Sequence, residues 1–129
     1  MNLADEIERN VAAALAEDVG SGDLTAQLTP DRPDAQAHVV CRQAAVLCGT
    51  AWFDACVKRL DTRAQVVWHA NDGDRIKPGT RICDITGSSR ALLTAERCAL
   101  NFLQLLSAVA TATRCYVDAV AGTRAAILD

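Results

Sequence analysis

One long helical pattern that contains a single cation constrains this chain more than any other feature. Apolar residues recur at three- and four-residue spacing at Leu92, Leu93, Ala99, Leu100, Leu103, Leu106, Val109 and Ala110. This spacing predicts a helix that buries one apolar stripe. Glu96, Arg97, Asn101 and Gln104 lie off that stripe, so Arg97 is expected to project sideways from a rigid element.

Two interpretations of Arg97 follow from the pattern. The first is an exposed arginine whose stem covers apolar surface while its head stays solvated. The second is an anion-binding arginine. If Thr94 is the N-cap of the helix, Arg97 lies in the first turn, where the helix dipole and the cation together favour an anion. If Ser89 is the N-cap, that argument lapses.

Composition excludes several classes of partner. The chain has 129 residues, half of them hydrophobic, which is enough for one core and predicts one domain. The net charge is −3 with the two signs interspersed, so neither nucleic acid nor an anionic membrane is an expected partner. No apolar run approaches the roughly 18 residues of a membrane-spanning helix, and the start is acidic and amphipathic, unlike a signal peptide.

The six cysteines form no CxxC pair, and neither histidine stands at ligand spacing from another candidate. We therefore expect no metal site and predict that most cysteines pack as small hydrophobic residues. Free cysteines are typical of a reducing compartment, which favours a cytoplasmic location.

The remaining pattern predicts an α+β fold, a small antiparallel sheet flanked by helices. A first helix begins at Leu3 and ends near Gly20, and a second is capped by Thr50. Strands are expected over 35–42, 64–69 and 80–85. From residues 89–94 onward the chain is expected to be helical to about Ala121, with Ser107 capping a second helix, and then strand-like after Gly122.

Four segments resemble one enzyme family in order. Thr94–Thr113 resembles the ERxALNxLxxLSGxA signature of quinolinate phosphoribosyltransferase, also called nicotinate-nucleotide pyrophosphorylase (carboxylating). Ala14–Thr25 is similar to its ALxEDxGxGDxT entry segment, and Trp68–Gly79 to its WxxxDGDxVxxG hairpin. Val39–Gly49 resembles its strand before a small-residue turn. The matches cover nearly the whole chain, and Ala108 departs from the pattern where the family usually has glycine.

The resemblance implies a β-hammerhead-like N-terminal α/β sandwich domain over 1–112. Residues 113–129 would then be a connecting helix and the start of a C-terminal α/β barrel that is otherwise absent from this chain. Barrels of this kind take about 250 residues. The resemblance thus implies that the 129-residue chain is inactive by itself.

The family's full-length enzyme converts quinolinate and phosphoribosyl pyrophosphate to nicotinate mononucleotide, pyrophosphate and CO2 in NAD biosynthesis, with Mg²⁺. By resemblance, the Mg²⁺ ligands and the catalytic residues lie in the barrel. Arg97 matches the family arginine that binds a substrate carboxylate across the interface of a homodimer. A planar guanidinium suits a carboxylate better than an ammonium does.

Two alternatives stay open. Gly73–Ile85 resembles the half-motif of biotinyl and lipoyl carrier modules, although Lys77 precedes Pro-Gly instead of standing at a hairpin tip. A related pyrophosphorylase or nicotinate phosphoribosyltransferase that acts on another nitrogen heterocycle also fits, because the substrate-selecting barrel residues are not in this chain.

The other polar candidates are expected to have mainly structural roles. Glu96 is expected to bind a neighbouring group, and Asn101 to tie a loop more than to bind substrate. Turn-forming aspartate and charges at the helix C-terminus explain the acidic residues near the first glycines, Glu17, Asp18 and Asp23, better than a cation site does. His38 and His69 are expected as packed or edge residues of strands, and Arg114 as either an interface residue or a solvated one.

Overall fold

The computed structural model describes residues 2–20 and 22–128; Met1, Ser21 and Asp129 lie outside the described residues. The helices are α1 (Leu3–Val19), α2 (Leu24–Gln27), α3 (Thr50–Leu60) and α4 (Ser89–Ala119). The strands are β1 (Ala35–Cys41), β2 (Ala45–Val46), β3 (Gln65–Trp68), β4 (Arg75–Ile76) and β5 (Thr80–Gly87). The predicted strands and the first helix are confirmed to within two residues at each end.

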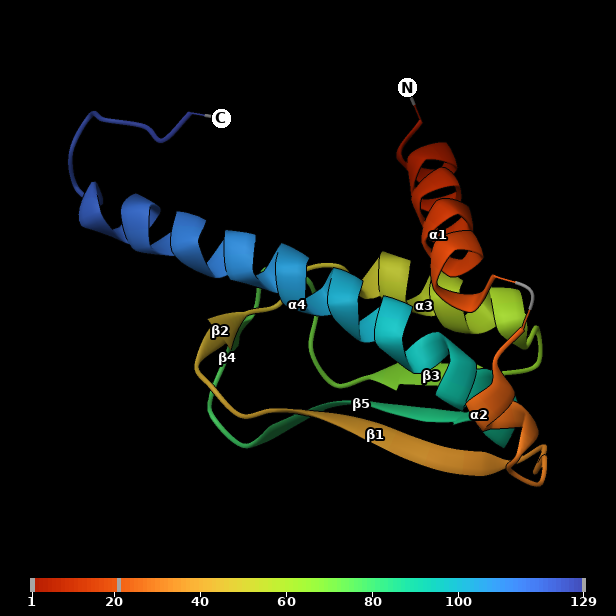
Figure 1. Cartoon of the computed structure of the whole chain (residues 1–129). Helices are drawn as coiled ribbons and strands as arrows, with labels where there is room; N and C mark the ends of the chain where they lie inside the picture. Colours follow the sequence, from red (N-terminus) through yellow and green to blue (C-terminus); the bar gives the residue numbers. More distant parts are fainter. Residues whose placement is uncertain (1, 21, 129) are drawn as a thin grey trace.

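The strands form two antiparallel sheets. The larger sheet has the order β1-β5-β3, and the smaller pairs β2 with β4. A register shift between Val39 and Val40 interrupts the β1–β5 ladder, a geometry that bends a strand. Figure 1 shows α3 and α4 on one side of the three-stranded sheet, with α1 standing beside them. This arrangement is the expected α+β fold.

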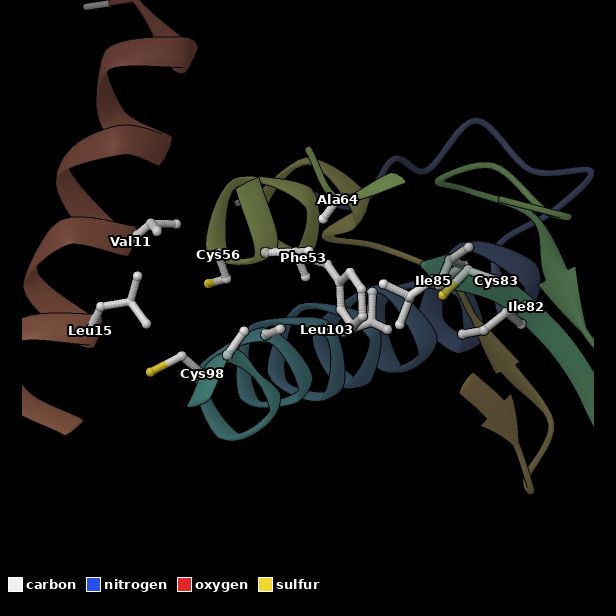
Figure 2. Packing of buried hydrophobic residues seen from close by; sticks show 14 of the residues in the cluster. Val11, Leu15, Phe53, Cys56, Ala64, Ile82, Cys83, Ile85, Cys98 and Leu103 are labelled. Carbon is white, nitrogen blue, oxygen red and sulfur yellow. The ribbon is translucent and has the colours of Figure 1, made fainter. Parts of the chain in front are cut away.

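The core lies where α3 and α4 meet the inner face of the sheet, and it continues to where α1 packs against these two helices. Figure 2 shows Val11 and Leu15 of α1 facing Cys56 of α3 and Cys98 of α4. Phe53 packs edge-on against Trp68, with ring centroids 5.3 Å apart. Among the described residues, fifteen buried ones form this cluster, which joins α1, α3 and α4 to one another and to the sheet.

The entry to α3 differs from the prediction. Gly49, not Thr50, is the N-cap, with φ +103°, and the amide of Thr50 donates to the carboxylate of Asp72 at 3.2 Å. An added Cβ on Gly49 would lie 2.9 Å from Cδ1 of Leu106. The close approach of α4 therefore requires glycine at the position before Thr50.

The long helix α4 is continuous, and this corrects two predictions. It begins at Ser89 with Ser88 as N-cap, so Thr94 is not the cap. Ser107 does not restart the helix, because its hydroxyl binds the backbone of a distant loop: it accepts from the amide of Cys48 and donates to the carbonyl of Cys48, each at 3.0 Å. The proposed boundary between residues 112 and 113 falls inside this helix and stays a prediction.

Ser107→Ala is expected to lower the free energy of unfolding by about 1–3 kcal/mol, because both polar groups of the part-buried Cys48 backbone lose their partner. Urea denaturation of the 129-residue chain measures this difference. Thr113→Ala is the matched control, since the Thr113 hydroxyl donates only to Val109 within the same helix. Equal urea midpoints for the two variants would contradict the hydrogen bonds between Ser107 and the Cys48 backbone.

The outer half of α4 exposes apolar side chains. Figure 1 shows this half extending past the sheet. Leu105, Val109 and Tyr116 are each more than 60% exposed, so the predicted stripe is wrong at Val109; it is also wrong at Leu93, which is 43% exposed. The buried positions of the helix are Ala95, Cys98, Ala99 and Leu103. Val117, Ile127 and Leu128 are also exposed, whereas Val120 is only partly exposed.

The tail does not follow the expected pattern. Residues 123–128 contain no strand, because no other segment lies beside them to complete a ladder. Within the described ranges, no helix combines the length and the apolar character that crossing a bilayer requires.

Candidate functional site

Arg97 lies in the third turn of α4. Because the helix begins at Ser89, the argument from the positive end of the helix dipole does not apply to it. Its neighbours Ala95 and Cys98 are buried, which holds this part of the helix against the core, while the Arg97 side chain is 81% exposed. The exposed guanidinium of Arg97 thus projects from a well-packed part of α4, away from the core as predicted.

Asp18 is the partner of Arg97. Oδ1 of Asp18 accepts a hydrogen bond from Nη1 of Arg97 at 3.3 Å. Asp18 stands in the last turn of α1, where the helix dipole disfavours a carboxylate, and only 23% of its side chain is exposed. The sequence predicts Asp18 only as a structural charge near the end of the first helix; its unfavourable place at a helix C-terminus is the one signal in the sequence that it binds a cation elsewhere.

Two hollows flank this ion pair. The first, of about 680 Å³, lies between the end of α1, the segment from Gly22 to Thr25 and the face of α4 from Leu93 to Leu100. The second, of about 490 Å³, lies between α1 and α4 beside Asn101 and Phe102. Asp18 and Arg97 line both hollows, so the guanidinium is reachable from either side.

Asp23 fixes the far wall of the first hollow. Its carboxylate caps α2 by accepting from the amide of Ala26 at 3.2 Å, and it also accepts from the hydroxyl of Thr94 at 3.1 Å. The hydroxyl of Thr94 therefore ties α2 to α4 instead of capping α4. Asp23 has the turn-forming role that was expected.

The acidic residues at the hollow do not form a cation site. Asp18 is paired with Arg97, Asp23 with Ala26 and Thr94, and the exposed Glu96 stands apart on α4. Across residues 2–20 and 22–128 no three metal-ligating side chains gather at one point. The described residues around this hollow therefore do not fit a Mg²⁺ ion.

The cysteines and histidines lie away from Arg97 or are inert. Burial raises the pKa of the Cys56 and Cys83 thiols to about 12, so both stay protonated as packed hydrophobic groups. His69 binds Asp84 at 2.8 Å, and this bond lowers the pKa of the Asp84 carboxyl. All six cysteines are free; three of them are buried as expected, two are partly exposed, and Cys115 is exposed, which differs from the prediction.

Asn101 and Glu96 are further candidate site residues beside Arg97. Asn101 is exposed and lines the second hollow together with Arg97. Glu96 is exposed and lines the first. The structural partners expected for these two side chains are not found among the described residues.

Comparison with known proteins points to one family. Residues 23–107 match the model of the quinolinate phosphoribosyl transferase N-terminal domain. The chain is 37% identical over 98 residues to a probable nicotinate-nucleotide pyrophosphorylase (carboxylating) of Bacillus subtilis, covering 76% of this chain and 34% of the relative. It is 32% identical over 111 residues to quinolinate phosphoribosyltransferase (decarboxylating) 1b of Nicotiana tabacum, covering 84% and 32%.

A solved structure agrees. The nicotinate-nucleotide pyrophosphorylase of Francisella tularensis superimposes with a TM-score of 0.88 at 38% identity, covering 91% of this chain and 41% of that one. The chain spans about a third of the length of the curated relatives it matches. The matched range includes Asp23, Thr94 and Arg97, so most residues around the first hollow lie within it, while Asp18 at the end of α1 lies just before it. The chain belongs to the quinolinate phosphoribosyltransferase family and corresponds to its N-terminal domain.

Proposed function

We propose that this chain is the N-terminal domain of a quinolinate phosphoribosyltransferase. The whole enzyme would convert quinolinate and phosphoribosyl pyrophosphate to nicotinate mononucleotide, pyrophosphate and CO2 in NAD biosynthesis. The observation that carries the proposal is Arg97: within the family-matched range, it presents a solvent-accessible guanidinium at an open hollow on a rigid helix. This domain contributes a carboxylate-binding arginine, not the groups that break or form bonds.

The charges around Arg97 support a shared site. Three carboxylates, of Asp18, Asp23 and Glu96, and one guanidinium line the first hollow. A dicarboxylate such as quinolinate would meet net negative charge there, so one arginine cannot hold it without further cations. We propose that those cations come from the barrel of a second subunit, with Arg97 reaching the substrate in trans across a homodimer interface.

The exposed apolar side chains of α4 support such an assembly. Leu105, Val109 and Tyr116 lie on the outer half of the helix, and exposed apolar patches favour association. The six free cysteines are consistent with a cytoplasmic enzyme. In this proposal Mg²⁺ accompanies the pyrophosphate and is held by residues outside this chain.

The proposal is tested by product formation in two samples. A full-length enzyme that carries this domain is expected to form nicotinate mononucleotide from quinolinate, phosphoribosyl pyrophosphate and Mg²⁺. The 129-residue chain alone is expected to form none, because the transferase names belong to relatives of which it covers only about a third. Chromatography of the reaction mixtures measures the product.

Each sample has an outcome that contradicts the proposal. Product from the purified 129-residue chain would show that the chemistry does not depend on a barrel. A full-length enzyme that accepts nicotinate or another nitrogen heterocycle in place of quinolinate would favour the related phosphoribosyltransferase. The carrier-module alternative has no support, since the family match and the superposition both point to the transferase domain.

A further inference from the structure

We propose that Asp18 is a positioning residue for Arg97: its carboxylate holds one end of the guanidinium and leaves the other edge free for a ligand carboxylate. This inference deepens the proposed function and rests on it. It starts from the geometry of the contact. The contact is a single one, from Nη1 of Arg97 to Oδ1 of Asp18, across 79 residues of sequence.

The rest of the guanidinium is available to a ligand. Within residues 2–20 and 22–128, Nε and Nη2 of Arg97 make no hydrogen bond to the protein. These two nitrogens form the edge of the fork that binds a carboxylate with two parallel hydrogen bonds. An arginine held through Nη1 alone therefore keeps its bidentate edge.

The surroundings of the pair make Asp18 an anchor more than a competitor for Arg97. The Asp18 side chain is mostly covered and contacts only one end of the guanidinium, while the Arg97 side chain is 81% exposed, so a ligand can reach the free edge from the solvent side. Open hollows lie on both sides of the Arg97 side chain, so packing around its guanidinium does little to fix its rotamer. Without Asp18, ligand binding would have to order a freely rotating side chain.

The placement of Asp18 also points to a purpose beyond folding. A carboxylate in the last turn of α1 opposes the helix dipole, and that turn contains no basic residue. A solvent-accessible ion pair contributes little to the free energy of unfolding, so the pair does not offset this cost. Local rules are broken most often where a site requires it, and the residue that Asp18 contacts is the cation of the candidate site.

Kinetics of the full-length enzyme test the role. Asp18→Asn is expected to raise the KM for quinolinate about 3- to 10-fold, the cost of ordering one long side chain, with kcat nearly unchanged. Glu17→Gln is the matched control: it removes one negative charge from the adjacent position of α1, and Glu17 makes no described contact with Arg97. It is expected to leave the KM unchanged.

Three kinetic outcomes would overturn the inference. A lower KM in Asp18→Asn would make Asp18 a competitor for Arg97. Equal changes of KM in Asp18→Asn and Glu17→Gln would show that the loss of any negative charge from this part of α1 has the same effect. An Asp18→Asn effect that persists in an Arg97→Ala background would show that Asp18 acts on the fold and not through Arg97.

A second readout separates this inference from the proposed function. In the 129-residue chain, the NMR signal of the Arg97 Nε–H group is expected to differ from those of solvated arginines. It should move to their position in Asp18→Asn and stay unchanged in Glu17→Gln. If the full-length enzyme proves inactive on quinolinate but this pattern holds, the proposed function fails while the anchoring stands. A wild-type Arg97 signal indistinguishable from solvated arginines overturns the anchoring itself.

Discussion

Replacing Arg97 by lysine or alanine is expected to lower kcat/KM for quinolinate in the full-length enzyme by roughly 30- to 1000-fold. This range corresponds to about 2–4 kcal/mol, the loss of a charge-assisted bidentate contact to a carboxylate that is desolvated in the assembled site. Lysine keeps the charge but not the planar fork, so it is expected to rescue little. Steady-state kinetics at saturating phosphoribosyl pyrophosphate measure the effect.

Arg59→Ala controls for the loss of any surface arginine. Like Arg97, Arg59 is exposed and makes a single contact to a carboxylate, here to Glu8 at 3.2 Å. Its loss is expected to change kcat/KM by less than about twofold, as for a surface ion pair. Folded Arg97 variants with wild-type efficiency would make Arg97 a solvated surface residue and remove it from the proposed site.

A mixed dimer tests whether Arg97 acts in trans. One subunit carries Arg97→Ala with an intact barrel, and the other carries an inactivating barrel substitution with Arg97 intact. If Arg97 reaches across the interface, the intact barrel receives the intact arginine, and the purified mixed dimer is expected to have about half of the wild-type activity although both parent dimers are defective. If Arg97 serves its own barrel, both sites of the mixed dimer stay defective and no activity returns.

The second large effect concerns the fold. Gly49→Ala is expected to lower the free energy of unfolding by about 2–5 kcal/mol, from two causes. Gly49 has φ +103°, which a side chain disfavours, and its added Cβ would lie 2.9 Å from Cδ1 of Leu106 and 3.4 Å from the carbonyl oxygen of Phe102. Urea denaturation of the 129-residue chain gives the value.

Gly73→Ala separates these two causes. Gly73 has a similar φ of +93°, but no atom lies within 4 Å of the position of an added Cβ. Its substitution is expected to cost only the backbone strain, about 1–2 kcal/mol. Equal losses of unfolding free energy in the two variants would contradict the close contact between Gly49 and Leu106 of α4.

Local pattern was sufficient for most of the secondary structure. The strand predicted over residues 35–42 and the helix predicted from Leu3 to near Gly20 are both found, because the order of apolar and polar residues along an element lies in neighbouring positions. The same reasoning placed Arg97 off the buried stripe of its helix, where it is found. The ordered motifs then pointed to the family that the comparisons show.

Contacts between distant residues decided the rest. Ser107 reads as a cap in sequence, yet the helix continues because Cys48, 59 residues away, uses its hydroxyl. Thr94 reads as a cap, yet it binds Asp23. The predicted tail strand does not form because a strand requires a partner for its backbone groups.

For the candidate site too, one part was predictable from the sequence and another part depended on the tertiary structure. The sequence alone determined the arginine, because its place on the helix follows from spacing and its chemistry from residue type. Only the tertiary structure decided its partner and its surroundings, because Asp18 meets Arg97 when α1 packs beside α4, and the two hollows exist only between packed elements. Spacing along one helix determines direction, whereas the contacts of a side chain depend on every element that folds beside it.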